Sequence, residues 1–78
     1  MIDTVRRRAF AAFLIDLSNG MASADDWYEY AVNHYFDETL ETIRCCCVRF
    51  AQEAGPPFPR TEEQKRQLRE WAVQLGRS

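Results

Sequence analysis

The residues best suited to metal or redox chemistry in this 78-residue chain are three consecutive cysteines, Cys45, Cys46 and Cys47. Neighbouring residues of a helix point about 100° apart, so three in a row cannot converge on one metal ion. The chain has no Cys-x-x-Cys spacing, and its single histidine, His34, lies eleven residues before the first cysteine. We therefore expect no metal site and interpret the thiols as small buried apolar side chains in a reducing, cytoplasmic compartment.

His34 has Asp37 and Glu38 three and four positions further on, which is the helical spacing for contact on one face. A catalytic dyad would also need a nucleophile or a metal beside it, and neither Ser18 nor Ser23 is placed to serve. Two of the three glycines are predicted at helix ends, so no phosphate-cradling loop is expected. The sequence therefore predicts no catalytic residue, no cofactor and a non-enzymatic protein.

The most unusual electrostatic feature is an acidic block between residues 25 and 41, which carries six carboxylates and no Lys or Arg. Aromatic side chains interleave with these acids. At protein interfaces aromatic residues often dominate the binding free energy, and complementary charge speeds association. The residues that we assign to a partner-binding face are Asp26, Trp27, Glu29, Tyr30, His34, Asp37 and Glu41.

A protein with a basic surface is the partner that such a face fits. Nucleases, toxins and defence proteins that hold phosphate are basic where they do so, and immunity proteins and phage-encoded inhibitors occlude surfaces of this kind. A self-associating structural protein is the alternative, a homodimer through the outward face of the long central helix, because so small a bundle has little means to bury its many apolar side chains. A DNA-binding regulator is a weaker alternative, since the third helix mixes Lys65, Arg66 and Arg69 with three glutamates.

The same carboxylates have a competing partner within the chain. Residues 6–8 are all arginine and fall in the first two turns of the first predicted helix. Antiparallel packing brings the start of that helix towards residues 36–41, where the arginines would face Asp37, Glu38 and Glu41. Internal ion pairs therefore compete with the partner-binding interpretation.

Hydrophobic spacing predicts an all-α, three-helix bundle that forms one domain over residues 1–78. A long central helix is expected over about residues 24–54, flanked by antiparallel helices over about residues 4–17 and 62–75. A break in the central helix near residues 33–37 is the alternative.

Local signals set these boundaries. Ser23 with Asp26, and Thr61 with Gln64, have the spacing of capping boxes that begin the second and third helices. Gly55 precedes two prolines and suits the end of the central helix.

The apolar stripes predict which side chains form the core. The first helix is expected to bury Ile2, Val5, Ala9, Phe10, Phe13 and Leu17, leaving Ala11, Leu14 and Ile15 off its core face. The central helix is expected to bury Tyr28, Val32, Tyr35, Phe36, Thr39, Ile43, Cys46, Cys47, Phe50 and Ala54. The third is expected to bury Leu68, Trp71, Ala72 and Leu75, and Phe58 to pack under the preceding turn. The opposite face of the central helix then directs Trp27, Tyr30, His34, Glu41, Cys45 and Val48 outward.

Composition narrows the classes of partner. A net charge of −2 and a pI of about 5.3 disfavour binding to nucleic acid. The longest apolar run, Ala9 to Ile15, is far shorter than the roughly 20 residues that span a bilayer, and no secretion signal precedes it. We therefore expect a cytoplasmic protein that binds neither nucleic acid nor membrane.

Overall fold

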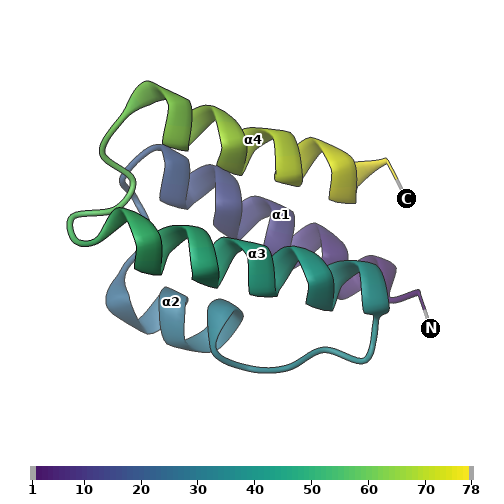
Figure 1. Ribbon diagram of the computed structural model, residues 1–78. Helices are drawn as coiled ribbons and strands as arrows, with labels where there is room; N and C mark the ends of the chain where they lie inside the picture. Colours follow the sequence, from purple (N-terminus) through teal and green to yellow (C-terminus); the bar gives the residue numbers. More distant parts are fainter. Residues whose placement is uncertain (1, 78) are drawn as a thin grey trace.

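Four α-helices make up the described part of the chain, residues 2–77 of the computed structural model (Figure 1). In chain order they are α1 (Thr4–Ser18), α2 (Ala24–Ala31), α3 (Glu38–Ala54) and α4 (Glu62–Gly76). The predicted all-α bundle is confirmed, with four helices in place of three. None of these four helices has the length and apolar character needed to cross a membrane.

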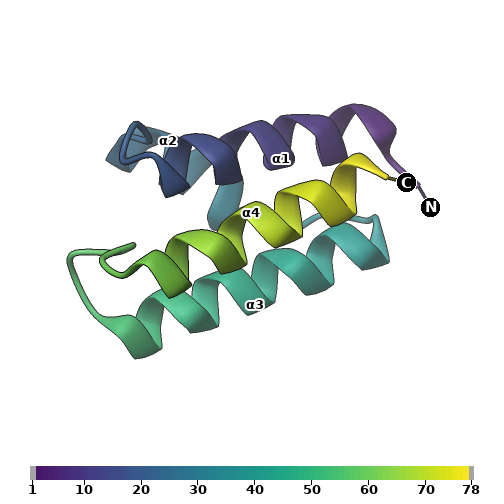
Figure 2. The same cartoon turned by 90° about the horizontal axis from the view of Figure 1, so that it is seen from above.

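Successive helices run in opposite directions, which gives an up-down-up-down order (Figure 1 and Figure 2). α1 packs most closely against α4, so the first and last helices lie side by side, with the start of α1 and the end of α4 at the same end of the bundle. α2 and α4 lie on opposite sides, with α1 and α3 between them (Figure 1). Their outer surfaces therefore point away from each other.

The predicted central helix over residues 24–54 is wrong, because the chain forms two helices there and leaves a connection over residues 32–37. Two local hydrogen-bonding side chains explain the break. The Asn33 amide donates to the carbonyl oxygen of Glu29 at 2.8 Å, at the end of α2. Asp37 has an extended backbone and accepts from two backbone N–H groups in the first turn of α3, at 3.1 and 3.3 Å. Such side chains offer the backbone an alternative to a continuous helix.

The break also changes which face of α2 is buried. The ring centroids of Trp27 and Tyr30 lie 6.1 and 5.2 Å from that of Phe13 on α1, so both aromatics pack on the core. The expectation that Tyr28, Val32 and Phe36 lie in the core is wrong, because all three are exposed. A separate α2 is not tied to the helical phase of α3, and the rings of Trp27 and Tyr30 turn inward while that of Tyr28 stays exposed.

α1 buries a different arc from the predicted one. Leu14 is completely buried, whereas Ile2 and Val5 are exposed, Val5 to 79%. α1 is flanked by α2 on one side and α4 on the other, so its core surface is broader than a single stripe. The residues of α1 in the core cluster are Phe10, Phe13, Leu14 and Leu17.

α3 and α4 follow their predicted stripes more closely. On α3 the buried positions include Ile43 and Cys47, but Thr39 and Cys46 are exposed against expectation. On α4 the predicted seam is confirmed, with Leu68, Ala72 and Leu75 buried and Trp71 half-buried. The Phe58 ring lies 5.6 Å from that of Phe50, which confirms that it packs under the turn between these helices.

Candidate functional site

The connection between α2 and α3 is held at its end by a buried ion pair. The Arg7 guanidinium donates from Nη2 to Oδ1 of Asp37 at 2.7 Å and from Nε to Oδ2. The backbone N–H of Asp3 donates to the same carboxylate at 2.9 Å. These hydrogen bonds outweigh the opposing effect of burial and hold the pKa of Asp37 well below its usual range. Asp37 is 2% exposed and serves the fold, so its carboxylate cannot meet a partner.

A second polar cluster holds the middle of the connection. Arg44 donates to both carboxylate oxygens of Glu41, at 2.8 and 2.6 Å, and to the carbonyl oxygen of Ala31 at 2.8 Å. Glu41 also accepts from the backbone N–H of Tyr35 at 2.9 Å and lies 2.9 Å from Nδ1 of His34. The hydrogen bonds from Arg44 are the main reason that the pKa of Glu41 falls well below its usual range.

Two of the carboxylates that were assigned to a partner, those of Asp37 and Glu41, are therefore paired within the chain. Internal pairing holds for Asp37 with Arg7, as the arginine run predicted. The partner of Glu41 is Arg44 and not one of the three arginines at residues 6–8. The signal was present, because the two residues are three positions apart on one helix, the spacing of side-chain contact.

The other predicted site residues fall into two groups. Trp27 and Tyr30 are half-buried against α1, and Asp26 completes the capping box of α2 with Ser23 through hydrogen bonds of 3.0 and 3.1 Å. The side chains of Glu29 and His34 are exposed, and His34 is held by its contact with Glu41. The seven residues thus do not form one continuous outward surface.

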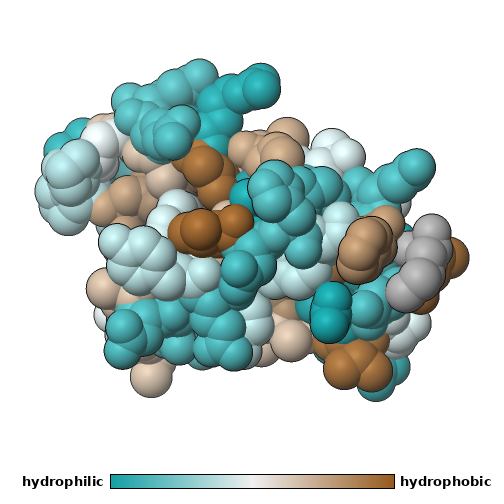
Figure 3. All heavy atoms as spheres, turned by 90° about the horizontal axis from the view of Figure 1, so that it is seen from below, coloured by the Kyte–Doolittle hydropathy of each residue, from teal (hydrophilic) through white to brown (hydrophobic). Residues whose placement is uncertain are grey.

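The outer surface of α2 and of the connection that follows it is formed by other side chains. Tyr28 is 66% exposed, Val32 51% and Phe36 82%. Asp25 and Glu29 are exposed on α2, and each lies three positions before an exposed apolar or aromatic residue, Tyr28 and Val32 respectively. We call Asp25, Tyr28, Glu29, Val32 and Phe36 the α2 outer face. Figure 3, which views the α2 side of the bundle, shows apolar side chains as islands among hydrophilic ones.

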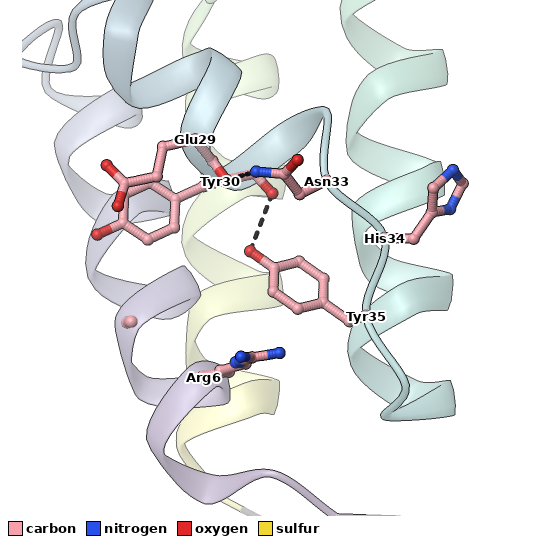
Figure 4. Close-up of a pocket in the computed structure, with 7 residues that line it drawn as sticks. Arg6, Glu29, Tyr30, Asn33, His34 and Tyr35 are labelled. Atoms are coloured by element: carbon pink, nitrogen blue, oxygen red, sulfur yellow. Dashed lines mark hydrogen bonds between the residues drawn. The ribbon is translucent and has the colours of Figure 1, made fainter.

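An open groove of about 360 Å³ lies beside this face, between α1 and the connection (Figure 4). The Tyr35 hydroxyl donates to the carbonyl oxygen of Tyr30 at 3.0 Å, and Arg6 of α1 extends beneath the Tyr35 ring. Glu29 lies at the opposite side of the groove, while the His34 ring points away from it towards α3. The groove thus combines one carboxylate, one guanidinium and two phenol rings, which suits contact with a mixed polar and apolar surface.

The three cysteines occupy different environments. Cys45 and Cys46 are exposed, whereas Cys47 is buried and its pKa is raised to about 12 by that burial. Sγ of Cys45 lies 3.4 Å from Nη2 of Arg44. Among residues 2–77 no three His, Cys, Asp or Glu side chains come together as a metal site would require. The interpretation of buried apolar thiols therefore applies to Cys47 alone.

Comparisons with protein-family models, with curated proteins and with solved structures find no match to this chain.

Proposed function

We propose that this protein is a small, non-enzymatic binding module that acts in the cytoplasm and occludes a basic surface of another protein with its α2 outer face. The observation that carries the proposal is the position of Phe36. This ring is 82% exposed, although the residues on both sides of it are fixed. Burying such a ring in a partner contributes roughly 1.5–3 kcal/mol, which is large for so small a surface.

The two polar clusters support a preformed surface. On one side of Phe36, the backbone N–H of Tyr35 is bonded to Glu41, and on the other side Asp37 is bonded to Arg7. A segment fixed in this way loses little conformational entropy when it binds, which favours affinity. Two polar clusters thus fix the residues on either side of an aromatic ring that remains in solvent.

The negative charge on and around the α2 outer face supports a basic partner. Asp37 and Glu41 are neutralised by arginines, but Asp25, Glu29 and Glu38 are exposed. Residues 24–43 contain no Lys or Arg. Negative potential around an aromatic anchor fits a surface that binds phosphate, as in nucleases, toxins or defence proteins, and the mode of action is that of an immunity protein or phage-encoded inhibitor.

Capture from a lysate of the organism that encodes the chain tests the proposal when it is run with matched variants. The test variants of the full chain are Phe36→Ser and the double variant Asp25→Lys/Glu29→Lys. Their controls are Val73→Ser, exposed on α4, and Glu53→Lys/Glu63→Lys, which makes the same charge change at corresponding helix positions.

The expected result is a basic protein that the wild type and both controls retain and both test variants lose. With that protein purified, the lysine variant should associate more slowly, and its association rate should depend less on salt. Retention that is equal in all five proteins, or the absence of any retained protein, would contradict the proposal.

A further inference from the structure

α4 carries a second exposed surface whose charge is opposite to that of the α2 outer face. Arg66, Arg69, Val73 and Arg77 are spaced three or four positions apart and so share one side of the helix. All four are exposed and line one open groove of about 590 Å³ together with Glu70 and Gln74. We call these four residues the α4 basic face. Within residues 2–77, none of its three guanidinium groups forms an ion pair.

We infer that the α2 outer face also binds the α4 basic face of a second copy of this chain. This inference rests on the proposed function, because it uses the same docking surface. The two faces are complementary in pattern as well as in charge. Tyr28 and Val32 each follow an exposed acid, Asp25 and Glu29, by three positions, and Val73 lies four positions from both Arg69 and Arg77. Arginine forms bidentate hydrogen bonds with carboxylates, which gives such a contact specificity.

The positions of the two helices determine the form of the assembly. α2 and α4 lie on opposite sides of the bundle, so one copy cannot join its own two faces (Figure 1). The contact is therefore head-to-tail, with different surfaces meeting, and each added copy leaves a new face exposed at either end. The expected product is a series of growing oligomers rather than a single closed dimer.

The short α2 makes this contact weak. Eight residues of helix are about 12 Å long, and an interface of that size falls below the area of stable complexes. We expect a dissociation constant of ~100 µM, so a tighter basic partner would displace the second copy. At protein concentrations above that constant, self-association would cover the α2 outer face until the partner displaces the second copy.

Sedimentation velocity of the full chain between 10 µM and 1 mM tests the inference when charge-reversed variants are mixed. The α2 variant is Asp25→Lys/Glu29→Lys and the α4 variant is Arg66→Glu/Arg69→Glu. All four positions are exposed, and circular dichroism confirms that each variant is folded.

The wild type should show a weight-average sedimentation coefficient that rises with concentration at ~50 mM salt and falls towards that of the monomer at ~500 mM. Each variant alone should stay monomeric, because its two faces then have like charge. An equimolar mixture should associate again, as should a chain that carries all four substitutions. A monomeric wild type at 1 mM, association that survives in either variant, or a mixture that stays monomeric would overturn the inference.

The α4 variant separates this inference from the proposed function. A foreign basic partner needs only the α2 outer face, so it should bind Arg66→Glu/Arg69→Glu as well as the wild type. A foreign partner that binds a strictly monomeric wild type would overturn the second-copy inference alone. If self-association is lost and restored as the charge-reversed variants predict, but no foreign protein is retained from the lysate, only the proposal of a foreign partner is contradicted.

Discussion

Arg7 of α1 and Asp37 at the start of α3 form an ion pair that is almost completely excluded from solvent. Thirty residues separate them in the chain, so the pair fixes the start of α3 against the start of α1. The same carboxylate also accepts from the first-turn N–H groups of α3. One side chain therefore ends the connection, caps a helix and joins two elements of the bundle.

Breaking this pair should destabilise the protein strongly. In Asp37→Asn the Arg7 guanidinium stays buried without its counter-charge, a situation that is much worse than losing a surface pair. We expect the melting temperature to fall by more than about 10 °C in a thermal unfolding experiment. The control is Arg6→Met, which removes an exposed pair with Asp3 and should change the melting temperature by at most about 2 °C. Equal melting temperatures for the two variants would contradict a structural role for the buried pair.

The two depressed pKa values predict how stability depends on pH. The pKa values of Asp37 and Glu41 are lower in the folded protein than their ordinary values of 3.8 and 4.5. Their contribution to the free energy of unfolding is therefore complete above those ordinary values and is lost as the pH falls below them. Urea unfolding between pH 7 and pH 2.5 should show a steep loss below about pH 4.5, and Glu41→Gln should reduce the slope. A free energy of unfolding that is constant from pH 6 to pH 3 would contradict this linkage.

A pair of substitutions in α1 tests its observed orientation. Leu14 is completely buried, so Leu14→Ala should lower the free energy of unfolding by about 2–5 kcal/mol. Val5 is exposed, so Val5→Ala should change it by less than about 0.5 kcal/mol. The hydrophobic pattern alone assigned Val5 to the core and Leu14 outside it. Urea titrations in which Val5→Ala is the more damaging change would support that earlier assignment instead.

The sequence was sufficient for features that depend on local chemistry. The capping boxes at Ser23 and Thr61 place the starts of α2 and α4, because a cap involves residues only three positions apart. Gly55 ends α3 with a positive φ of 71°, as its place before two prolines indicated. The α4 seam followed from helical periodicity alone.

The features that the sequence did not settle depend on contacts between distant residues. Apolar spacing continues through residues 32–37 and favours one continuous helix. The local hydrogen bonds of Asn33 and Asp37 interrupt it, and the distant Arg7 holds the Asp37 carboxylate that caps α3. Once α2 is a separate helix, its orientation is decided by the fit of Trp27 and Tyr30 on Phe13. For this reason Trp27 and Tyr30, which were predicted to point outward, pack inward. The exposed surface is formed instead by the residues of the α2 outer face.

The three thiols should differ in their reactivity towards a thiol reagent. Cys45 and Cys46 are exposed and should both react with Ellman's reagent in the native protein at pH 8. Cys47 is buried and its pKa is raised to about 12, so it should react only when the protein unfolds. The expected stoichiometry is two thiols in buffer and three in urea, with Cys47→Ala giving two in both. Three rapidly reacting thiols in the native protein would contradict the packing of α3.

The proposal that the connection is preformed makes a prediction that needs no partner. The backbone N–H of Tyr35 donates to Glu41, so its hydrogen exchange should be slow for a residue in a connection. Glu41→Gln removes the charge that Arg44 binds and weakens the acceptor, because hydrogen bonds to ionised groups are the stronger ones. We expect the Tyr35 amide to exchange at least about tenfold faster in this variant, when both proteins are followed by NMR under the same conditions. The control is Glu38→Gln, an exposed acid on the same helix, which should leave the rate unchanged. If the Tyr35 amide exchanges equally fast in all three proteins, Phe36 is not held in place, and the argument for its role as an anchor loses its basis.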